Sequence, residues 1–349
     1  MVAKLGINAS IGIALGAAAD PYGTALAVSE KLIVESISWS ENVNKLSSAG
    51  IGSGGILSDN MERGFIAGTL SISGLCGYDN GFPLFLAQFM GTAGTPTEQN
   101  ASEGDYLHSI LMSGAANANF ITLALESSST TVIEFPSVTV NSITISASPG
   151  DFLRYTIEAN FDQLVTTSTE NSNAEIQAVT TTDTEYSIAA FEESFQMNAQ
   201  TGGAFSSDEI AITSYELSLS RPQSFKPEIK GSAGNSVPTA DDKAVGTLSI
   251  GLKEHTDNTY ETAAIAASEY KSSLNIQGTQ IASGDTKTIE LLLPRMKLID
   301  TPDFGLSSAG NNPVTLVFDL LEATANPTGM SDTTPYVELT NETSTAYIS

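Results

Sequence analysis

The sequence predicts a mainly β protein built from two tandem halves, each with a flanking helix and a long loop between two strands. One observation is a repeat: residues 68–80 return as 246–258, at an offset of 178 positions (246 − 68), with seven of the thirteen residues identical. Within it, Leu70 and Ile72 alternate with hydroxyl residues, the two-residue period of a half-buried strand. Only 15% of the residues are charged, and the abundant small residues suit strands and turns better than long helices.

The regions that flank the repeat also resemble one another. Residues 35–41 match 215–221 at an offset of 180 (215 − 35), and residues 154–161 match 313–320 at an offset of 159 (313 − 154). Residues 133–136 resemble 289–294, where both segments begin with Ile-Glu and end on a proline. Four segments in the same order indicate a tandem duplication. The smaller downstream offset places about twenty extra residues in the first copy, within 91–119.

The first half is expected to contain a strand, a long glycine-rich loop, the repeated strand, a helix and four further strands. Their ranges are 31–41, 45–63, 65–74, 83–90, 120–125, 131–135, 138–146 and 153–161. Pro83 suits the first turn of the helix, where its missing N–H costs least. The loop is too long for a tight hairpin and too rich in glycine for a helix, so we expect a partner to order it.

The second half repeats this order after a connector rich in Thr, Ser and Glu. Its long loop is expected at 221–243, its helix at 259–271, and one strand of the tail at 336–340. The expected units are a first domain at 1–165, the connector at 166–194, a second domain at 195–325 and a C-terminal tail at 326–349.

The charge balance argues against a protein that grips nucleic acid. There are 40 acidic and 14 basic residues, a formal net charge of −26, whereas affinity for nucleic acid rests on Lys and Arg that neutralise phosphates. The single cysteine, Cys76, excludes an intrachain disulfide. No apolar run reaches the length of a membrane-spanning helix. The weakly signal-like start is expected to be part of the fold, because Asn8 and Ser10 interrupt its apolar run.

The chain offers little catalytic chemistry. Its two histidines, His108 and His255, lie in unrelated settings, so spacing assembles neither a metal site nor a histidine-based triad. Adjacent carboxylates such as Asp241 and Asp242 point to opposite sides of an extended chain and are expected to be solvated. The glycines between 50 and 55 lack the Lys-Ser/Thr of a phosphate-binding loop. We expect no enzyme activity, no cofactor and no metal.

The duplicated β-rich halves, the long loop between two strands, the step from strand to helix and the closing hairpin resemble the tail tube (major tail) proteins of long-tailed bacteriophages. The resemblance covers most of the chain and rests on patterns, without a catalytic signature. It implies two tail-tube-like β-sandwich domains. It also implies rings of three chains, pseudo-hexameric because each chain carries two domains, that stack into a tube around the channel for the genome.

The resemblance implies which residues line the channel and which reach the next ring. The small polar residues expected on the channel face are Ser36, Ser38, Ser40, Thr69, Ser71, Ser73, Thr156, Glu158, Asn160, Asp162, Glu216, Ser218, Ser220, Thr247, Ser249, Thr315 and Asp319. Those expected in the inter-ring loops are Lys45, Gly50, Gly54, Asp59, Arg63, Arg221, Lys226, Lys230, Asp241 and Lys243. If Arg154 faces the channel, it needs an acidic neighbour such as Asp151, or it lies at the rim.

The implied partners are further copies of the chain and the other tail proteins: tape measure, tail terminator and tail tip. Double-stranded DNA would pass without specific binding, no membrane is involved, and the protein would be assembled in the host cytoplasm and located in the virion. Two alternatives stay open. One is a tail-tip or baseplate ring component with the same fold. The other is a secreted or surface-layer β-sandwich adhesin, which the acidic, Ser/Thr-rich composition also suits.

Overall fold

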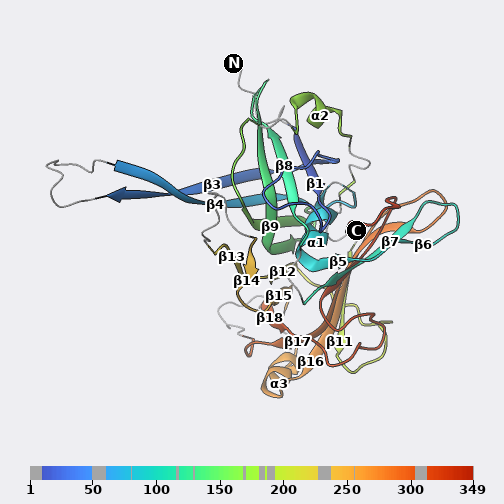
Figure 1. Ribbon diagram of the computed structural model, residues 1–349. Coiled ribbons are helices and arrows are strands. Elements are labelled where there is room, and N and C mark those ends of the chain that lie inside the picture. The colour runs from blue at the N-terminus through green and yellow to red at the C-terminus, as the bar shows by residue number, and fades with distance from the viewer. Residues whose placement is uncertain are drawn as a thin grey trace.

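The computed structural model describes residues 10–48, 60–79, 81–114, 118–128, 130–167, 170–180, 185–186, 193–226, 237–254, 256–302 and 313–348. Within them the protein is mainly β, with antiparallel pairing throughout, as the sequence predicts (Figure 1). The strands are β1 (Ile11–Leu15), β2 (Glu30–Leu32), β3 (Ser36–Ser48), β4 (Asn60–Leu75), β5 (Gly91–Ala93), β6 (Thr97–Glu98), β7 (Tyr106–Met112), β8 (Ile121–Glu126), β9 (Val132–Ala147), β10 (Arg154–Phe161), β11 (Glu193–Ala199), β12 (Ser214–Ser220), β13 (Gln223–Ser224), β14 (Thr239–Ala240), β15 (Val245–Leu252), β16 (Glu269–Gln280), β17 (Thr286–Leu298), β18 (Val314–Leu320) and β19 (Tyr336–Asn341). The helices are α1 (Phe82–Met90), α2 (Asn173–Ala178) and α3 (Thr259–Ile265).

Eight of these strands form one continuous sheet that crosses from the first half of the chain to the second. Their order is β3-β4-β10-β9-β12-β15-β18-β17, and the junction between the halves is the pair β9–β12. The first four strands and the last four occur in the same order, since β12, β15, β18 and β17 take the places of β3, β4, β10 and β9.

The pairing registers agree with two of the offsets found in the sequence. Ile37, Ile72 and Ile157 are cross-strand neighbours on β3, β4 and β10, and Tyr215, Ile250 and Leu316 are cross-strand neighbours on β12, β15 and β18. The last two positions differ by 178 (250 − 72) and 159 (316 − 157).

The offset of 180 between residues 35–41 and 215–221 is wrong, because the register makes Tyr215 the equivalent of Ile37, at an offset of 178 (215 − 37). The sequence match slipped by two residues, since Ser and an apolar residue alternate in both strands. An even slip leaves every side chain on its expected face.

A second layer covers one face of this sheet. The first part of β9 bends away to pair with β8, which pairs with β1, and the first part of β17 likewise pairs with β16, which pairs with β11. Helix α1 is buried over its whole length and contacts both β9 and β8. Pro83 lies in its first turn, and it ends at Gly91 with a positive φ of 89°, the usual glycine stop. One apolar core runs through both halves of the chain.

Several predicted elements have different bounds in the structure. Both ends of the expected loop 45–63 are strand, because β3 continues to Ser48 and β4 begins at Asn60; the two strands form an arm that projects from the molecule (Figure 1). The expected strand 31–41 is divided between β2 and β3, and the two strands expected between 131 and 146 are the single bent strand β9.

The helix predicted at 259–271 is half wrong. α3 ends at Ile265, and Ala267 has a φ of +51°, a conformation that a helix cannot continue through. From Glu269 the chain is strand β16, paired with β11 and β17. The range 259–271 is therefore divided between two different elements.

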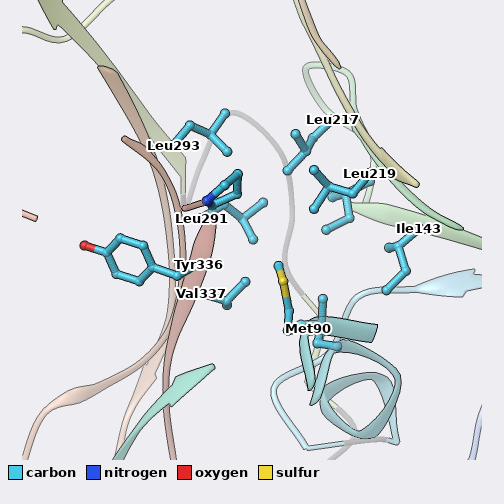
Figure 2. A pocket seen from close by; sticks show the side chains of 11 residues that line it. Met90, Ile143, Leu217, Leu219, Leu291, Leu293, Tyr336 and Val337 are labelled. Carbon is cyan, nitrogen blue, oxygen red and sulfur yellow. The ribbon is translucent and has the colours of Figure 1, made fainter. Parts of the chain in front are cut away.

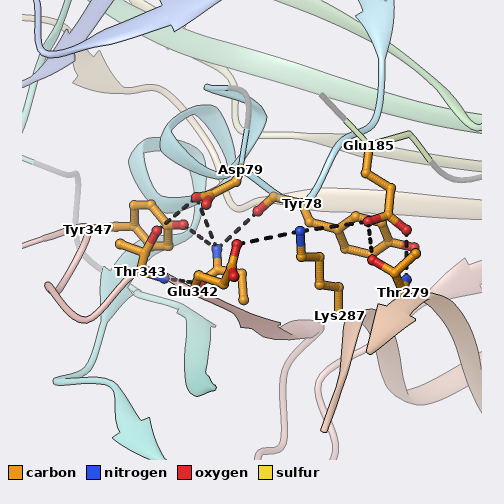
Figure 3. Close-up of polar contacts among 9 residues, drawn as sticks. Tyr78, Asp79, Glu185, Thr279, Lys287, Glu342, Thr343 and Tyr347 are labelled. Carbon is orange, nitrogen blue, oxygen red and sulfur yellow. Dashed lines mark hydrogen bonds and ion pairs between the residues drawn. The ribbon is translucent and has the colours of Figure 1, made fainter. Parts of the chain in front are cut away.

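The extra residues of the first half pair with the C-terminal tail. Strand β7 pairs with β19, and β19 pairs with β17, so the insertion extends a sheet of the second half. The fully buried Asn341 donates from Nδ2 to the Tyr78 carbonyl oxygen (3.0 Å) and to the Tyr347 hydroxyl (2.7 Å). Figure 3 shows Tyr78 and Tyr347 close to Thr343 and Glu342 of the tail. Nearby, Lys287 Nζ lies 3.7 Å from Glu185 and 3.6 Å from Glu342. These contacts fasten the tail to both halves.

Candidate functional site

Small polar side chains cover the open face of the eight-stranded sheet, and we call this surface the hydroxyl face. It consists of Ser36, Ser38, Ser40, Thr69, Ser71, Ser73, Ser142, Thr144, Ser146, Thr156, Glu158, Asn160, Glu216, Ser218, Ser220, Thr247, Ser249, Thr315 and Asp319, all exposed or half-buried. The registers place Arg154, Val317 and Lys297 on the same side of the sheet. One row of cross-strand neighbours runs Ser36, Ser73, Thr156, Thr144, Ser218, Thr247, Asp319 across seven strands. Because cross-strand neighbours point to the same side of a sheet, the row is continuous.

Most of the predicted channel-facing residues therefore lie together on one face. Their neighbours along each strand point to the other side and are buried, such as Ile72, Ile157 and Leu248. This clean alternation explains why a two-residue period places them correctly.

Asp162 was assigned to this face wrongly. Strand β10 ends at Phe161, and Asp162 is only 5% exposed. Its carboxylate lies close to Gly23, and it contributes to raising the pKa of Tyr22, after the larger effect of burial. A period counted past the end of a strand no longer reports the direction of a side chain.

Sequence reasoning missed part of the face. Ser142, Thr144 and Ser146 on β9 lie in the middle of it, next to β10 and β12. The alternation that would have found them is present, since Ile143 and Ile145 between them are buried. A β-bulge where β9 pairs with Glu158 and Ala159 shifts the alternation of side chains by one residue. The two-residue period therefore cannot be followed through to the start of β9.

Hydrogen bonds within the face join hydroxyls to each other and to carboxylates. The Ser36 and Ser73 hydroxyls are 2.7 Å apart, and the Ser71 hydroxyl donates to Glu158 Oε1 at 2.7 Å. Across the junction, the Thr144 hydroxyl of β9 donates to the Ser218 hydroxyl of β12 at 3.4 Å. The face thus presents oxygen atoms and water-binding groups.

The charges of the face are negative, apart from two paired cations at its ends: Arg154, and Lys297 on β17 opposite Asp319, whose Nζ lies 2.9 Å from Glu269 Oε1. Glu158, Glu216 and Asp319 carry the carboxylates. Arg154 forms ion pairs with Glu35 and with Asp151 Oδ1, the latter at 3.2 Å. Hydrogen bonds to Glu35 and then Asp151 raise the pKa of Arg154, and its hydrogen bond lowers the pKa of Asp151. Arg154 therefore has the acidic neighbour that the sequence reasoning required.

Arg221 was predicted to lie in a loop between rings, and this is wrong. It is 5% exposed and sits at the junction of the halves, where Nη2 donates to the carbonyl oxygens of Ser113 (2.7 Å) and Met90 (3.4 Å). Its guanidinium lies 5.8 Å from the centre of the Phe89 ring. Burial lowers its pKa. The arginine thus joins the end of β12 to the last turn of α1, where the helix dipole favours a cation.

The other predicted loop residues that the structure describes lie on the β3–β4 arm or near the β13–β14 hairpin. Lys45 is exposed and pairs through its backbone with Arg63. Lys226 Nζ lies 3.6 Å from Asp241 beside the small β13–β14 hairpin, and Lys243 is exposed. Gly50, Gly54, Asp59 and Lys230 lie outside the described residues.

The junction of the halves is closed beneath the sheet by apolar side chains. A small cavity there is lined by residues of β9, β12, α1, β17 and the tail; Figure 2 shows Ile143, Leu217, Leu219, Met90 and Leu291 pointing toward it. With no polar group from the sheet aimed into it, this cavity is part of the core.

In the part of the chain that the structure describes, no cluster of three or more His, Cys, Asp or Glu could hold a metal ion. No helix among the same residues is long and apolar enough to cross a membrane. The chain matches no protein-family model, and no curated protein sequence matches it.

Proposed function

We propose that the chain is a structural virion protein, the tail tube protein of a long-tailed bacteriophage, which assembles into rings that stack into a tube. Each chain would contribute two tail-tube-like β-sandwich domains with a flanking helix and a projecting arm. Three chains would make a pseudo-hexameric ring. The hydroxyl face would line an acidic, non-adhesive channel for the genome.

The observation that carries this proposal is the continuous hydroxyl face. DNA must slide through such a channel, and every free Lys or Arg on its wall would release counterions from the duplex and hold a phosphate. Among the described residues of this side of the sheet, both cations are paired with carboxylates: Arg154 with Glu35 and Asp151, and Lys297 with Glu269. Carboxylates such as Glu158 and Glu216 repel the phosphates, and hydroxyls hold a layer of water.

The recurring strand order supports the same proposal. The halves match in order and register, and β9–β12 pairing joins their sheets edge to edge. A chain that contains two equivalent units already joined side by side is suited to a ring built from equivalent units. The projecting β3–β4 arm, which carries Lys45, would contact the next ring, as would the region of Lys226 beside the β13–β14 hairpin.

In this proposal the partners are further copies of the chain and the other tail proteins, the location is the virion after assembly in the host cytoplasm, and the chain catalyses no reaction. The polar groups of the hydroxyl face are spread along seven strands and do not converge on one point, as a catalytic site would require.

Negative-stain electron microscopy of the purified protein, dilute and concentrated, tests the proposal together with its mass in solution. We expect rings with a central hole, three chains per ring, and stacks on concentration. A particle that stays monomeric at every concentration, also when seeded with preformed stacks, would refute the tube and favour an adhesin. Rings that never stack would favour a tail-tip component.

A further inference from the structure

Strand β16 carries a fully buried lysine, Lys271, that has no part in the hydroxyl face or in the junction of the halves. Its Nζ donates to three carbonyl oxygens, those of Gly203 (2.7 Å), Gly202 (3.2 Å) and Thr328 (2.6 Å). The centre of the Phe205 ring lies 5.3 Å from the same nitrogen. The amine is thus held in one place and shielded from water.

The side chain opposite this lysine is a carboxamide. Asn198 on β11 is the cross-strand neighbour of Lys271, so both side chains point to the same side of the sheet, with Cβ atoms roughly 4.5–5.5 Å apart. Asn198 Nδ2 and Lys271 Nζ donate to the same acceptor, the Gly203 carbonyl oxygen, at 3.4 Å and 2.7 Å. The amine and the carboxamide are therefore neighbours at their reactive ends.

A carboxylate completes the group. Asp208 Oδ2 accepts a hydrogen bond from Asn198 Nδ2 at 3.1 Å and another from the Ser206 N–H at 3.2 Å. The Met197 N–H donates to the Asp208 carbonyl oxygen at 3.1 Å, which fixes the backbone at this residue. The carboxamide oxygen, Asn198 Oδ1, is buried and accepts no hydrogen bond from the described residues. Asp208 thus lies beside the nitrogen that would leave the carboxamide.

We propose that the chain cross-links itself at this group: the Lys271 amine attacks the Asn198 carboxamide and forms an amide bond, with Asp208 as the proton carrier. The bond joins β11 to β16 covalently. This inference is independent of the proposed function. The reaction takes place once in each chain and consumes its own side chains, so it is compatible with a structural protein that turns over no substrate.

The reaction balances without a co-reactant. The lysine ammonium gives a proton to the Asp208 carboxylate, and the neutral amine attacks Cγ, so that a C–N bond forms and the carbonyl electron pair moves to Oδ1. The Cγ–Nδ2 bond then breaks as Asp208 returns its proton to Nδ2. Asp208 takes the surplus proton of Nζ and passes it to the released ammonia. Overall, an ammonium group and a carboxamide become one secondary amide and one ammonium ion.

The surroundings favour this attack. Burial lowers the pKa of Lys271, an effect that the charge of Asp208 opposes, and the neutral amine is the form that acts as a nucleophile. The loop of Gly202, Gly203 and Phe205 keeps water, the competing nucleophile, away from the carboxamide. A Cβ at Gly202 would lie 2.9 Å from the Ala199 carbonyl oxygen and 3.5 Å from Asn198 Cγ, so a glycine lets this loop close.

The mass of the purified, denatured full chain tests the bond. We expect a mass about 17 Da below that of the sequence, because one ammonia leaves when the amine displaces it. After proteolysis, a branched peptide should join Lys271 to Asn198. The bond closes a loop that spans 73 peptide bonds (271 − 198), so the unmodified chain should also migrate ahead of Lys271→Met on a denaturing gel.

Three variants separate the roles. Lys271→Met keeps an unbranched side chain without the amine and should retain its full mass. Asp208→Asn keeps the shape of the side chain but cannot carry the proton, and its loss of ammonia should be roughly a hundredfold slower. Lys226→Met changes an exposed lysine and is the matched control, which should lose ammonia as the unmodified chain does.

An unmodified, folded chain that keeps its full mass after long incubation at mildly alkaline pH would overturn the proposal, because Lys271 would then only hold three carbonyl oxygens. Loss of ammonia in Lys271→Met, or loss without the branched peptide, would overturn it too, because an asparagine would then have cyclised onto its own backbone. An unchanged rate in Asp208→Asn would overturn the role of that carboxylate. Ring formation is a separate readout, so failure of the bond leaves the proposed function standing.

Discussion

Removal of the guanidinium of Arg221 should weaken the whole protein, because this side chain joins the two halves at their junction. Its Nη2 donates to the Ser113 carbonyl oxygen at 2.7 Å and, at 3.4 Å, to that of Met90, and it lies over the Phe89 ring. A short hydrogen bond from a charged donor contributes about 1.5–3 kcal/mol, and a partly desolvated cation–π contact about 1 kcal/mol. We expect Arg221→Ala to lower the free energy of unfolding by about 3 kcal/mol.

Urea denaturation followed by tryptophan fluorescence measures this loss, since Trp39 is the only tryptophan. Arg221→Lys should lose less, about 1–2 kcal/mol, because an ammonium can keep the bond to Ser113 but not the planar contact with the ring. Lys226→Ala is the control, because Lys226 is 64% exposed and exposed ion pairs contribute little. A loss below about 1 kcal/mol for Arg221→Ala would refute the structural role of this arginine.

Three further predictions concern charge. Burial and then Asp79 raise the pKa of Glu30 from 4.5 to about 7, so ionisation opposes folding as the pH rises from 4.5 through 7; Glu30→Gln should raise the urea midpoint at pH 8 and leave it unchanged at pH 4. Hydrogen bonds from Arg295 and then Lys297 lower the pKa of Glu269 to about 2. The stabilisation by ionised Glu269 is therefore present above pH 4.5 and is lost as the pH falls toward 2. The urea midpoint of Glu269→Gln should fall less across this window than that of the unmodified protein, and the same fall in both proteins would contradict the ion pair. Lysines at Ser71 and Ser218 should make assembled rings bind a short DNA duplex, with affinity falling with salt at a slope of about −0.9 per phosphate contacted, measured by fluorescence anisotropy. The same lysines at the exposed Thr92 and Thr97 are the control, and equal binding by both variants would show that the hydroxyl face has no special access to DNA.

Most of the hydroxyl face could be predicted from the sequence, because polar and apolar residues alternate along a half-buried strand and the alternation shows which side each side chain faces. Ser71 and Ser218 alternate with buried residues, so composition and period agree. The alternation holds only within a strand, which is why the prediction placed Asp162, after the end of β10, on the wrong side. The alternation is also unchanged when two strands are aligned two residues out of step. The offset of 180 therefore looked correct in the sequence comparison, although the strand register contradicts it.

Contacts between distant segments were beyond reach of periodicity. Arg221 follows the alternating strand β12 and precedes a proline, and no local pattern shows that it meets Ser113 across the junction. The pairing of β7 with β19 likewise joins segments more than two hundred residues apart. Helix α3 cannot continue past Ala267, because this residue has a positive φ. An alanine side chain gives no sequence signal for that backbone conformation.

The most direct test of the central claim asks where the hydroxyl face lies in the assembled protein. Ser218→Cys is labelled before assembly with a maleimide that carries a heavy-metal cluster, and ring cross-sections are imaged by electron microscopy; Thr97→Cys is labelled as the control. We predict density inside the central hole for Ser218→Cys and on the outer rim for Thr97→Cys. Density on the outer rim for Ser218→Cys would contradict the account, because the hydroxyl face would then not line the channel.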